Sequence, residues 1–348
     1  MVNIGIVGLG FMGYTHFTAS RRLRGGKVVA IATRDPKKRS GDWTSIQGNF
    51  GPRGGHVDLS KVEVFAEMDE LLADPRIDLV DICLPTDLHE GAVKAALAAG
   101  KHVIVEKPIS IDPKAADRMI KLADRAGRLL MVGHVLPFFP EFRFLLDTVR
   151  SGKYGQLLGA QFRRMIAPPE WSADMSDFRK LGGWGIDLHI HDNHYIALLC
   201  GRPKKVFSRG LLADGFVNHV QSSYVFEEAT PAVGCVSGGI AAKGHPFGHG
   251  FEVYLEKATI LFSQAVIAGE ATSDRPLTVI TQDGKARGVK PKGDDEWCGA
   301  FTTELQAAVR SVQDQQVSPI LSAELARDAL KLCHAEAKSI ETGRIVPV

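Results

Sequence analysis

The fold class of this chain is decided at its start, by the run VNIGIVGLGFMG at Val2–Gly13. Val2–Val7 is a short apolar run of the kind that is buried on both faces of a parallel sheet. The glycines that follow, Gly8, Gly10 and Gly13, have the spacing Gly-x-Gly-x-x-Gly at the junction of a strand and a helix. The first permits a tight turn, the second lets the backbone approach a pyrophosphate, and the third lets the helix pack on the strand. The motif therefore predicts a dinucleotide site at the N-terminus of this helix, where N–H groups and the helix dipole favour anions.

Strand and helix patterns alternate through the first third of the chain. This β-α-β rhythm predicts a doubly wound parallel sheet with right-handed crossovers, in a domain spanning residues 1–134. Asp112 before Pro113 supplies an N-cap followed by proline at the first helical position. A Gly-rich stretch, Ser40–Leu59, is long for a connection and is interpreted as a surface excursion. The expected strands are Lys27–Ala32, Leu79–Leu84, His102–Val105 and Leu129–Val132, and the expected helices are Gly13–Leu23, Glu90–Ala99 and Pro113–Ala126.

After about His134 the pattern changes to that of an α+β domain, residues 135–348. From Lys204 to Ile280 the apolar runs are short and strand-like, with Gly, Pro, Asp and Lys between them, which predicts an antiparallel or mixed sheet. The last helix can pack back on the first domain. The other expected elements are the helices Glu141–Ser151, Asp187–Leu199, Phe301–Gln313 and Ala323–Thr342 and the strand Leu157–Met165.

Composition argues against several classes of protein. Of the 348 residues 45% are hydrophobic, and the formal net charge of +2 lacks the concentrated Lys and Arg that nucleic-acid binding needs. Five cysteines without a Cys-x-x-Cys pair argue against a disulfide framework and a thiolate zinc site, so no metal is expected and a reducing compartment is the default. No uncharged apolar run approaches the roughly 20 residues that span a bilayer, and the start lacks the basic region of a signal peptide. A cytoplasmic protein without membrane or nucleic-acid partners is expected.

The residues near the end of the second predicted strand bear on the choice of nucleotide. A carboxylate that holds the ribose hydroxyls usually stands about 20 residues beyond the glycine motif, but the chain has Thr33 and Arg34 there. Asp35 comes next, yet before a proline it is better interpreted as a helix N-cap. Together with Lys37–Arg39, Arg34 favours a 2′-phosphate and hence NADP. The alternative is that these basic side chains form a solvated turn and that the nucleotide is NAD.

Two separate segments supply candidate catalytic groups. Lys107 follows the strand His102–Val105, and ligands of open α/β sheets bind beyond the carboxyl ends of strands, where a lysine can stabilise developing negative charge. Asp187 and His191 stand four residues apart, so on one helix they share a face and can converge on a hydroxyl group. His189 and His191 point to nearly opposite sides of a helix, which argues against a shared metal. Taken singly, such a lysine is usually solvated and such a histidine is usually structural.

The chain resembles the glucose–fructose oxidoreductase / inositol dehydrogenase / MocA (Gfo/Idh/MocA) family. The similarity spans nearly the whole chain in the family's order, and its Ala-Gly-Lys-His-Val…Glu-Lys-Pro run is highly specific. The matching pieces are Gly8–Gly13, Asp78–Thr86 with His89, Ala99–Pro108, the Gly-rich segment with Asp187 and His191, and Glu341–Arg344. The resemblance implies an N-terminal Rossmann domain, a C-terminal domain with a large open sheet, and a homodimer or homotetramer formed through that sheet.

The resemblance also implies roles for individual residues in a dehydrogenase that acts on a sugar or polyol. His191 would accept the hydroxyl proton, Lys107 would orient substrate and nicotinamide, and Asp187 would hold the substrate or the lysine. Further substrate contacts are expected from Arg163, Trp184 and His189. The nucleotide is expected to contact Gly8, Gly10, Phe11, Met12, Gly13, Thr33, Arg34, Pro85, Thr86, His89, Glu106 and Lys107.

The chain departs from the family pattern near the substrate. Leu181 replaces the first of three glycines, His189 stands where a glycine is common, and Pro137 replaces a frequent arginine. These changes bear on substrate choice rather than on the chemistry. Two other functions stay open: an enzyme that retains its nucleotide and uses transient oxidation for elimination or glycoside cleavage, and a non-catalytic nucleotide-sensing protein.

Overall fold

The chain forms two compact units in a computed structural model that describes residues 1–48, 50–167, 178–227, 231–239, 245, 247–267, 270–293 and 296–348. The first unit comprises Met1–Phe138 and Asp294–Arg327, and the second comprises Phe139–Gly293 and Asp328–Val348. The expected division at residue 134 thus differs from the observed one, because the chain returns to the first unit late in the sequence. None of the helices in the described part of the chain is long and apolar enough to cross a membrane.

The first unit is built on a six-stranded parallel sheet with the strand order β3-β2-β1-β4-β5-β6. This order confirms the predicted doubly wound Rossmann fold. The strand order reverses between β1 and β4, and that is the point where ligands of such sheets bind. The strands are β1 (Val2–Val7), β2 (Gly26–Ala32), β3 (Glu63–Phe65), β4 (Leu79–Ile82), β5 (His102–Glu106) and β6 (Leu130–Gly133).

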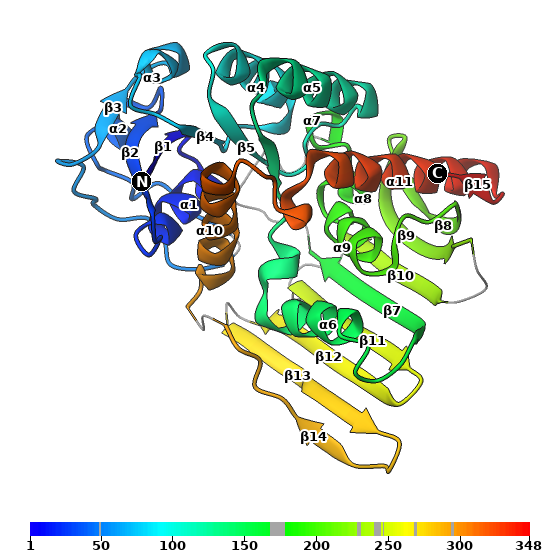
Figure 1. The fold of residues 1–348 in the computed structure, drawn as a ribbon. Helices are drawn as coiled ribbons and strands as arrows, with labels where there is room; N and C mark the ends of the chain where they lie inside the picture. Colours follow the sequence, from blue (N-terminus) through cyan, green and yellow to red (C-terminus); the bar gives the residue numbers. More distant parts are fainter. Residues whose placement is uncertain are drawn as a thin grey trace. The chain divides into compact units, whose positions relative to one another are not determined.

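Helices cover both faces of this sheet. On one face α4 packs on α5, and on the other α1 packs on α10, which belongs to the returning segment (Figure 1). Asp112 caps α5 by accepting from Lys114 N, as the sequence predicts, and Gly127 ends that helix in the left-handed conformation. The helices are α1 (Phe11–Ser20), α2 (Pro36–Arg39), α3 (Met68–Ala73), α4 (His89–Ala98), α5 (Pro113–Ala126) and α10 (Gly299–Asp314).

The excursion between α2 and β3 is more than a surface loop. Trp43 is fully buried, and its ring packs edge-on against Phe17 of α1. Phe50 stacks on Phe301 of α10 with ring centroids 5.6 Å apart and also contacts Phe11, the first residue of α1. An aromatic cluster therefore holds this segment against the helix that follows the glycine motif.

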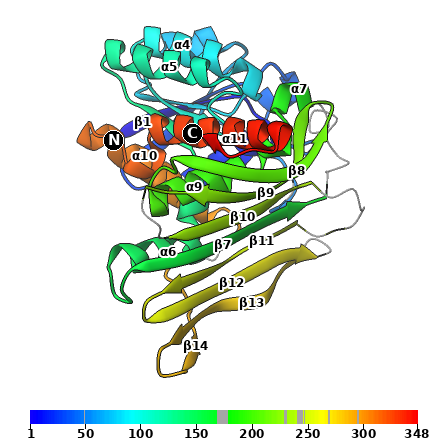
Figure 2. The same cartoon turned by 90° about the vertical axis from the view of Figure 1, so that its right-hand side faces the viewer.

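The second unit contains a nine-stranded sheet in which, among the described residues, only β7 and β10 are paired parallel (Figure 2). The strand order is β14-β13-β12-β11-β7-β10-β9-β8-β15, which confirms the predicted mostly antiparallel sheet. The strands are β7 (Leu157–Ile166), β8 (Lys205–Ala213), β9 (Phe216–Val225), β10 (Ala232–Gly239), β11 (Phe247–Leu255), β12 (Ala258–Ile267), β13 (Glu270–Thr281), β14 (Ala286–Gly288) and β15 (Val346–Pro347).

The two faces of this sheet differ. Side chains on one face pack against helices: the Ser222 hydroxyl donates to Glu336 of α11, and the backbone N–H of the neighbouring Ser208 donates to Ser339 of the same helix. Side chains on the opposite face, such as Gln161, Gln221 and Ser223, are exposed, in agreement with the expected open sheet. The helices are α6 (Pro140–Arg150), α7 (Phe178–Leu181), α8 (Trp184–Asp187), α9 (Ile190–Cys200) and α11 (Ala323–Thr342).

Candidate functional site

The glycine motif forms the turn between β1 and α1. Gly8 has φ +91°, and a Cβ there would stand 2.7 Å from the carbonyl oxygen of Cys83 at the end of β4. A Cβ on Gly13 would collide with the carbonyl oxygen of Gly8, so helix and strand approach as closely as they do only because of these glycines. A Cβ on Gly10, in contrast, would meet no atom of the described residues within 4 Å. Gly10 is the N-cap of α1 and leaves room at the positive end of that helix.

This arrangement fits a dinucleotide. The open position at Gly10 is where the backbone must come close to a pyrophosphate, and α1 directs its N-terminus to the same place. The loop that follows β4 reaches the same edge of the sheet, with Pro85 exposed and Thr86 half-buried. Phe11 and Met12 are half-buried in the first turn of α1. The residues predicted from the motif can therefore hold an NAD-type cofactor.

The ribose end of the expected nucleotide site lies at the end of β2. Thr33 is buried and Arg34 is exposed, and the guanidinium of Arg34 pairs with Glu67 at 3.2 Å. Asp35 accepts from the amides that begin α2, as the sequence predicts. The side chains of Lys38 and Arg39 are bonded to backbone carbonyls, those of Leu9 for Lys38 and of Thr33 and Arg34 for Arg39. Arg34 is thus exposed at this strand end, whereas Lys38 and Arg39 are half-buried.

His89 joins two loops at this edge of the sheet. Its Nδ1 lies 2.9 Å from the carbonyl oxygen of Pro108, and its Nε2 lies 2.9 Å from that of Leu84. The side chain is buried, and burial lowers the pKa of its imidazole below the ordinary value although both carbonyls act to raise it. Because both ring nitrogens have backbone partners, the structure gives His89 a role between the loops; its expected contact with the nucleotide stays a prediction.

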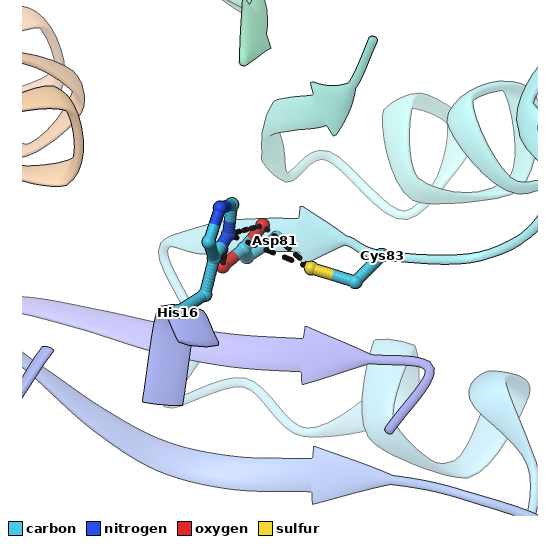
Figure 3. Close-up of side chains that lie close together, drawn as sticks. All are labelled: His16, Asp81 and Cys83. Atoms are coloured by element: carbon cyan, nitrogen blue, oxygen red, sulfur yellow. Dashed lines mark hydrogen bonds and ion pairs between the residues drawn. The ribbon is translucent and has the colours of Figure 1, made fainter. Parts of the chain in front are cut away.

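A cluster of buried ionisable side chains includes Glu106, the residue before Lys107. His16 of α1 faces Asp81 of β4, with Nδ1 2.9 Å from Oδ2, and Cys83 Sγ lies 3.5 Å from the same nitrogen (Figure 3). On the other edge of the ring, Nε2 forms an ion pair with Glu106 of β5 at 3.1 Å and lies 3.9 Å from Glu304 of α10. Four elements of the first unit therefore meet at one imidazole.

Electrostatics fixes the proton positions in this cluster. Burial lowers the pKa of His16, but Asp81 and Cys83 outweigh burial and hold that pKa well above its ordinary value. Burial raises the pKa of Glu304 well above its ordinary value, since its carboxyl oxygens have no hydrogen-bond partner among the described residues. We infer a protonated His16 and a protonated Glu304 at neutral pH. Sequence reasoning missed both; the available signal was Glu304 on the apolar face of a helix, three residues after Phe301.

In the second unit, glycines bring the segment of Asp187 close to the sheet. Gly182 and Gly183 have φ near +75°, and a Cβ on Gly183 or Gly185 would clash with Val217 of β9. The helix expected from Asp187 onward is interrupted: α8 ends at Asp187, and α9 begins at Ile190 after a turn. Asp187 and His191 are each half-buried, on α8 and α9 respectively. Their convergence with one another and with Lys107, which belongs to the first unit, stays a prediction.

His189 is the N-cap residue of α9 and is buried against the end of the chain. Its Nε2 lies 3.0 Å from Oε1 of Glu336 on α11, and the hydroxyl of Tyr224 lies 3.4 Å away. Burial lowers the pKa of His189, but Glu336 outweighs burial and the pKa ends above its ordinary value. Sequence reasoning missed Glu336, although an acidic residue on the apolar face of the last helix was a visible signal. The expected substrate contact of His189 remains a prediction.

The two arginines of β7 point to opposite faces of the sheet. Arg163 donates to Ser263 Oγ at 2.9 Å on the exposed face, across Gly250 of the intervening strand. Arg164 is buried and forms a two-pronged ion pair with Asp192 of α9. Of the pair, Arg164 rather than the predicted Arg163 thus lies on the face that carries α9.

Trp184 and His249 are core residues of the second unit. Trp184 is 1% exposed and packs with Ile166, Leu188 and Phe247. The His-rich segment at 245–249 includes the start of β11, where burial and Arg164 lower the pKa of His249 to about 3. A neutral His249 beside aromatic rings is a packing residue, and stacking of Trp184 on a substrate stays a prediction.

Comparisons with known proteins agree with this geometry. A family model described as "Oxidoreductase family, NAD-binding Rossmann fold" matches residues 2–134. The myo-inositol 2-dehydrogenase of Thermotoga maritima is 26% identical over 99% of this chain and 98% of its own. The solved apo scyllo-inositol dehydrogenase from Lactobacillus casei has 24% identity and a TM-score of 0.72, covering 100% of this chain and 98% of its own. An oxidoreductase from Agrobacterium radiobacter, solved in complex with NAD+, L-tartaric acid and magnesium, has 17% identity and a TM-score of 0.77, covering 99% and 98%.

Proposed function

We propose that this chain, whose residues 2–134 match the Gfo/Idh/MocA oxidoreductase family, is an NAD(P)-dependent dehydrogenase or reductase acting on a secondary alcohol of a polyol or sugar. The observation that carries the proposal is the glycine turn at the β1–β4 switch point, with room beside Gly10 at the N-terminus of α1. The dehydrogenase relatives that act on inositol support a polyol as the substrate class.

The chemistry divides between the nucleotide and the side chains. A bound nicotinamide supplies the hydride acceptor or donor. The loop Gly8–Gly13 holds the pyrophosphate, and Lys107 presents its ammonium at the carboxyl end of β5, where it stabilises negative charge on the substrate oxygen. His191 takes the hydroxyl proton during oxidation and returns it during reduction, because an imidazole can both accept and donate a proton. Asp187 orients the substrate or the lysine.

NADP is the proposed nucleotide. The expected position at the end of β2 is occupied by Thr33, which has no carboxylate and is buried. The acidic residue that follows in the sequence, Asp35, is engaged as a helix cap. The exposed guanidinium of Arg34 supports recognition of a 2′-phosphate, because its ion pair with Glu67 joins two well-exposed side chains and is weak.

The exposed face of the nine-stranded sheet supports a homodimer or homotetramer. Gln161, Arg163, Gln221 and Ser223 lie on it, and a two-fold axis can pair such a face with its copy. Sedimentation analysis of the parent and of Val236→Arg tests this assembly. A parent that sediments as a monomer contradicts it.

A panel of inositols, sugars and other polyols tests the function with each nucleotide in turn, monitored by the absorbance of the reduced nicotinamide. Lys107→Met and His191→Asn are expected to lower kcat by roughly 100-fold or more. Lys121→Met and His334→Asn are the matched controls, because both side chains are exposed. Turnover without net nicotinamide reduction would point to an enzyme that recycles its nucleotide, and nucleotide binding without any turnover would point to a sensing protein.

A further inference from the structure

The residues on either side of Lys107 are each held by a buried histidine. Glu106 contacts His16, and Pro108 contacts His89. The two histidines come from different helices, α1 and α4, and each is no more than 1% exposed. Lys107 therefore stands in a short segment that is fixed at both ends.

On the first side, a single carboxylate connects the imidazole of His16 to the backbone of the lysine. Glu106 Oε1 pairs with His16 Nε2 at 3.1 Å, and Glu106 Oε2 accepts a hydrogen bond from Lys107 N at 3.0 Å. The opposite nitrogen of the same ring is bound by Asp81 at 2.9 Å. Because the ring is clamped between two carboxylates, it fixes the rotamer of Glu106 and so the peptide from which Lys107 departs.

On the second side, the imidazole of His89 connects the lysine loop to the loop after β4. Nδ1 contacts the carbonyl of Pro108 and Nε2 that of Leu84, each at 2.9 Å. Carbonyl oxygens only accept hydrogen bonds, and a neutral imidazole donates from one nitrogen at a time. The contact that bears on Lys107 is the one from Nδ1, since Pro108 follows the lysine directly.

We infer that His16 and His89 are positioning residues that fix the segment Glu106–Pro108 from its two sides and so set the direction of the Lys107 ammonium. The inference rests on the proposed function, in which that ammonium acts on the substrate oxygen. It also explains why His16 stands three residues after the glycine motif. The helix that is expected to bind the pyrophosphate then also holds the segment of Lys107 in place.

Pairs of amide variants separate the two nitrogens of each ring. The amide of glutamine reaches the position of Nε2, and the shorter asparagine reaches that of Nδ1. His16→Gln therefore places an amide N–H opposite Glu106, where His16 Nε2 forms an ion pair, whereas His16→Asn retains only the donor toward Asp81. At the second site the order is reversed: His89→Asn retains the donor toward Pro108, and His89→Gln retains only the one toward Leu84. Both members of a pair lose the ring and any charge on it, so each is the control of the other.

The expected result is a crossed pattern in kcat. His16→Asn and His89→Gln lose roughly 10- to 100-fold, the size of effect that a displacement of about 1 Å produces, while the loss in His16→Gln and His89→Asn is expected to be clearly smaller. The KM for the nucleotide and the melting temperature are expected to be alike within each pair. Equal kcat values within both pairs would overturn the inference and leave the histidines a purely structural role.

A second readout does not need turnover. Competitive acetylation of the lysines, quantified by mass spectrometry, reports the reactivity of Lys107 relative to exposed Lys121. In His16→Asn and His89→Gln the relative reactivity of Lys107 is expected to rise toward that of Lys121, and in the partner variants it is expected to match the parent. If the parent has no dehydrogenase activity but the variants show this crossed pattern of Lys107 reactivity, the proposed function alone is refuted. If the crossed pattern of reactivity is absent, the positioning roles are refuted.

Discussion

Glu336 Oε1 lies 3.0 Å from His189 Nε2 in the interior of the second unit. The same carboxylate accepts from Ser222, Tyr224 and Asn193. Although burial raises the pKa of Glu336, His189, Ser222 and Asn193 lower it below the ordinary value. Glu304 in the first unit is equally buried, but its carboxyl oxygens have no hydrogen-bond partner among the described residues and its pKa is raised. The chain thus contains one buried glutamate held ionised and one held neutral.

Substitution by glutamine is expected to distinguish these two glutamates. Glu336→Gln leaves a buried imidazolium without its counter-charge, which costs about 3–5 kcal/mol, or roughly 6–20 °C in melting temperature. Glu304→Gln replaces a neutral carboxyl group by a neutral amide of the same shape and is expected to change stability by about 1 kcal/mol or less. Thermal melts of both variants and the parent measure the difference. Equal losses would contradict the assignment of charge.

Stability is expected to depend on pH through His16. Its pKa is raised in the folded state above the ordinary 6.5, so its contribution is fully present below about pH 6.5 and is lost as the pH rises through the raised value. The stability difference between the parent and His16→Gln should fall by up to about 1.4 kcal/mol per pH unit across that window. Urea unfolding of both proteins from pH 6 to pH 9 measures it.

A metal ion at the same cluster would give the opposite sign. His16, Glu106 and Glu304 offer ligand atoms within 4.8 Å of one another, and metal binding requires a deprotonated ring. Stability would then rise with pH and would fall on addition of EDTA. Either outcome, or stoichiometric zinc or manganese in the purified protein, would contradict a protonated His16.

Replacing two glycines of the turn by alanine, one at a time, should separate the effect on nucleotide binding from the effect on folding stability. Gly10→Ala places a methyl group in open space where the pyrophosphate is expected, so nucleotide affinity should fall at least about tenfold with little change in melting temperature. Gly13→Ala forces the helix away from the carbonyl of Gly8 and should lower both. Calorimetric titration with NADP and thermal melts measure the two effects. An unchanged affinity in Gly10→Ala would contradict the placement of the pyrophosphate.

The nucleotide preference is expected to depend on Arg34. Arg34→Ala removes a charge-assisted contact with a 2′-phosphate and should raise the KM for NADP roughly 10- to 100-fold, while the KM for NAD changes little. Arg125→Ala, at an exposed position of α5, controls for the loss of one surface charge. Equal effects on NAD and NADP would contradict the proposed contact.

Local signals were sufficient to predict most elements of this chain. Pro113–Ala126 and Ala323–Thr342 are helices with the predicted boundaries, because a capping aspartate and proline mark the start of the first and Gly343 ends the second. The glycine spacing predicted the turn after β1. The elements β3 and α3 were missed, since Glu63–Phe65 is too short to give a periodic signal.

Contacts between residues distant in sequence could not be predicted in this way. The residues near His16 and His189 in the sequence do not predict the contacts of these histidines with Glu304 and Glu336, which come from the last two helices. The interruption between α8 and α9 depends on packing against β9 rather than on any helix-breaking residue at positions 188 and 189. The local clue was the presence of acidic residues on the apolar faces of these helices. Such a residue indicates that a charged group is buried, but it does not identify the partner.

The return of the chain at residue 294 has a consequence for biosynthesis. When β6 leaves the ribosome, the face of the parallel sheet that α1 and α10 share is covered by α1 alone, because α10 is encoded beyond the entire stretch Phe139–Gly293. At ordinary elongation rates the nascent chain waits roughly ten seconds or more before the missing helix emerges. The second unit waits as well, since β15 and the end of α11 are translated after α10. A protein truncated anywhere before the final helix would thus release two incomplete units, and early termination should yield substrates for chaperones and proteases rather than a usable nucleotide-binding fragment.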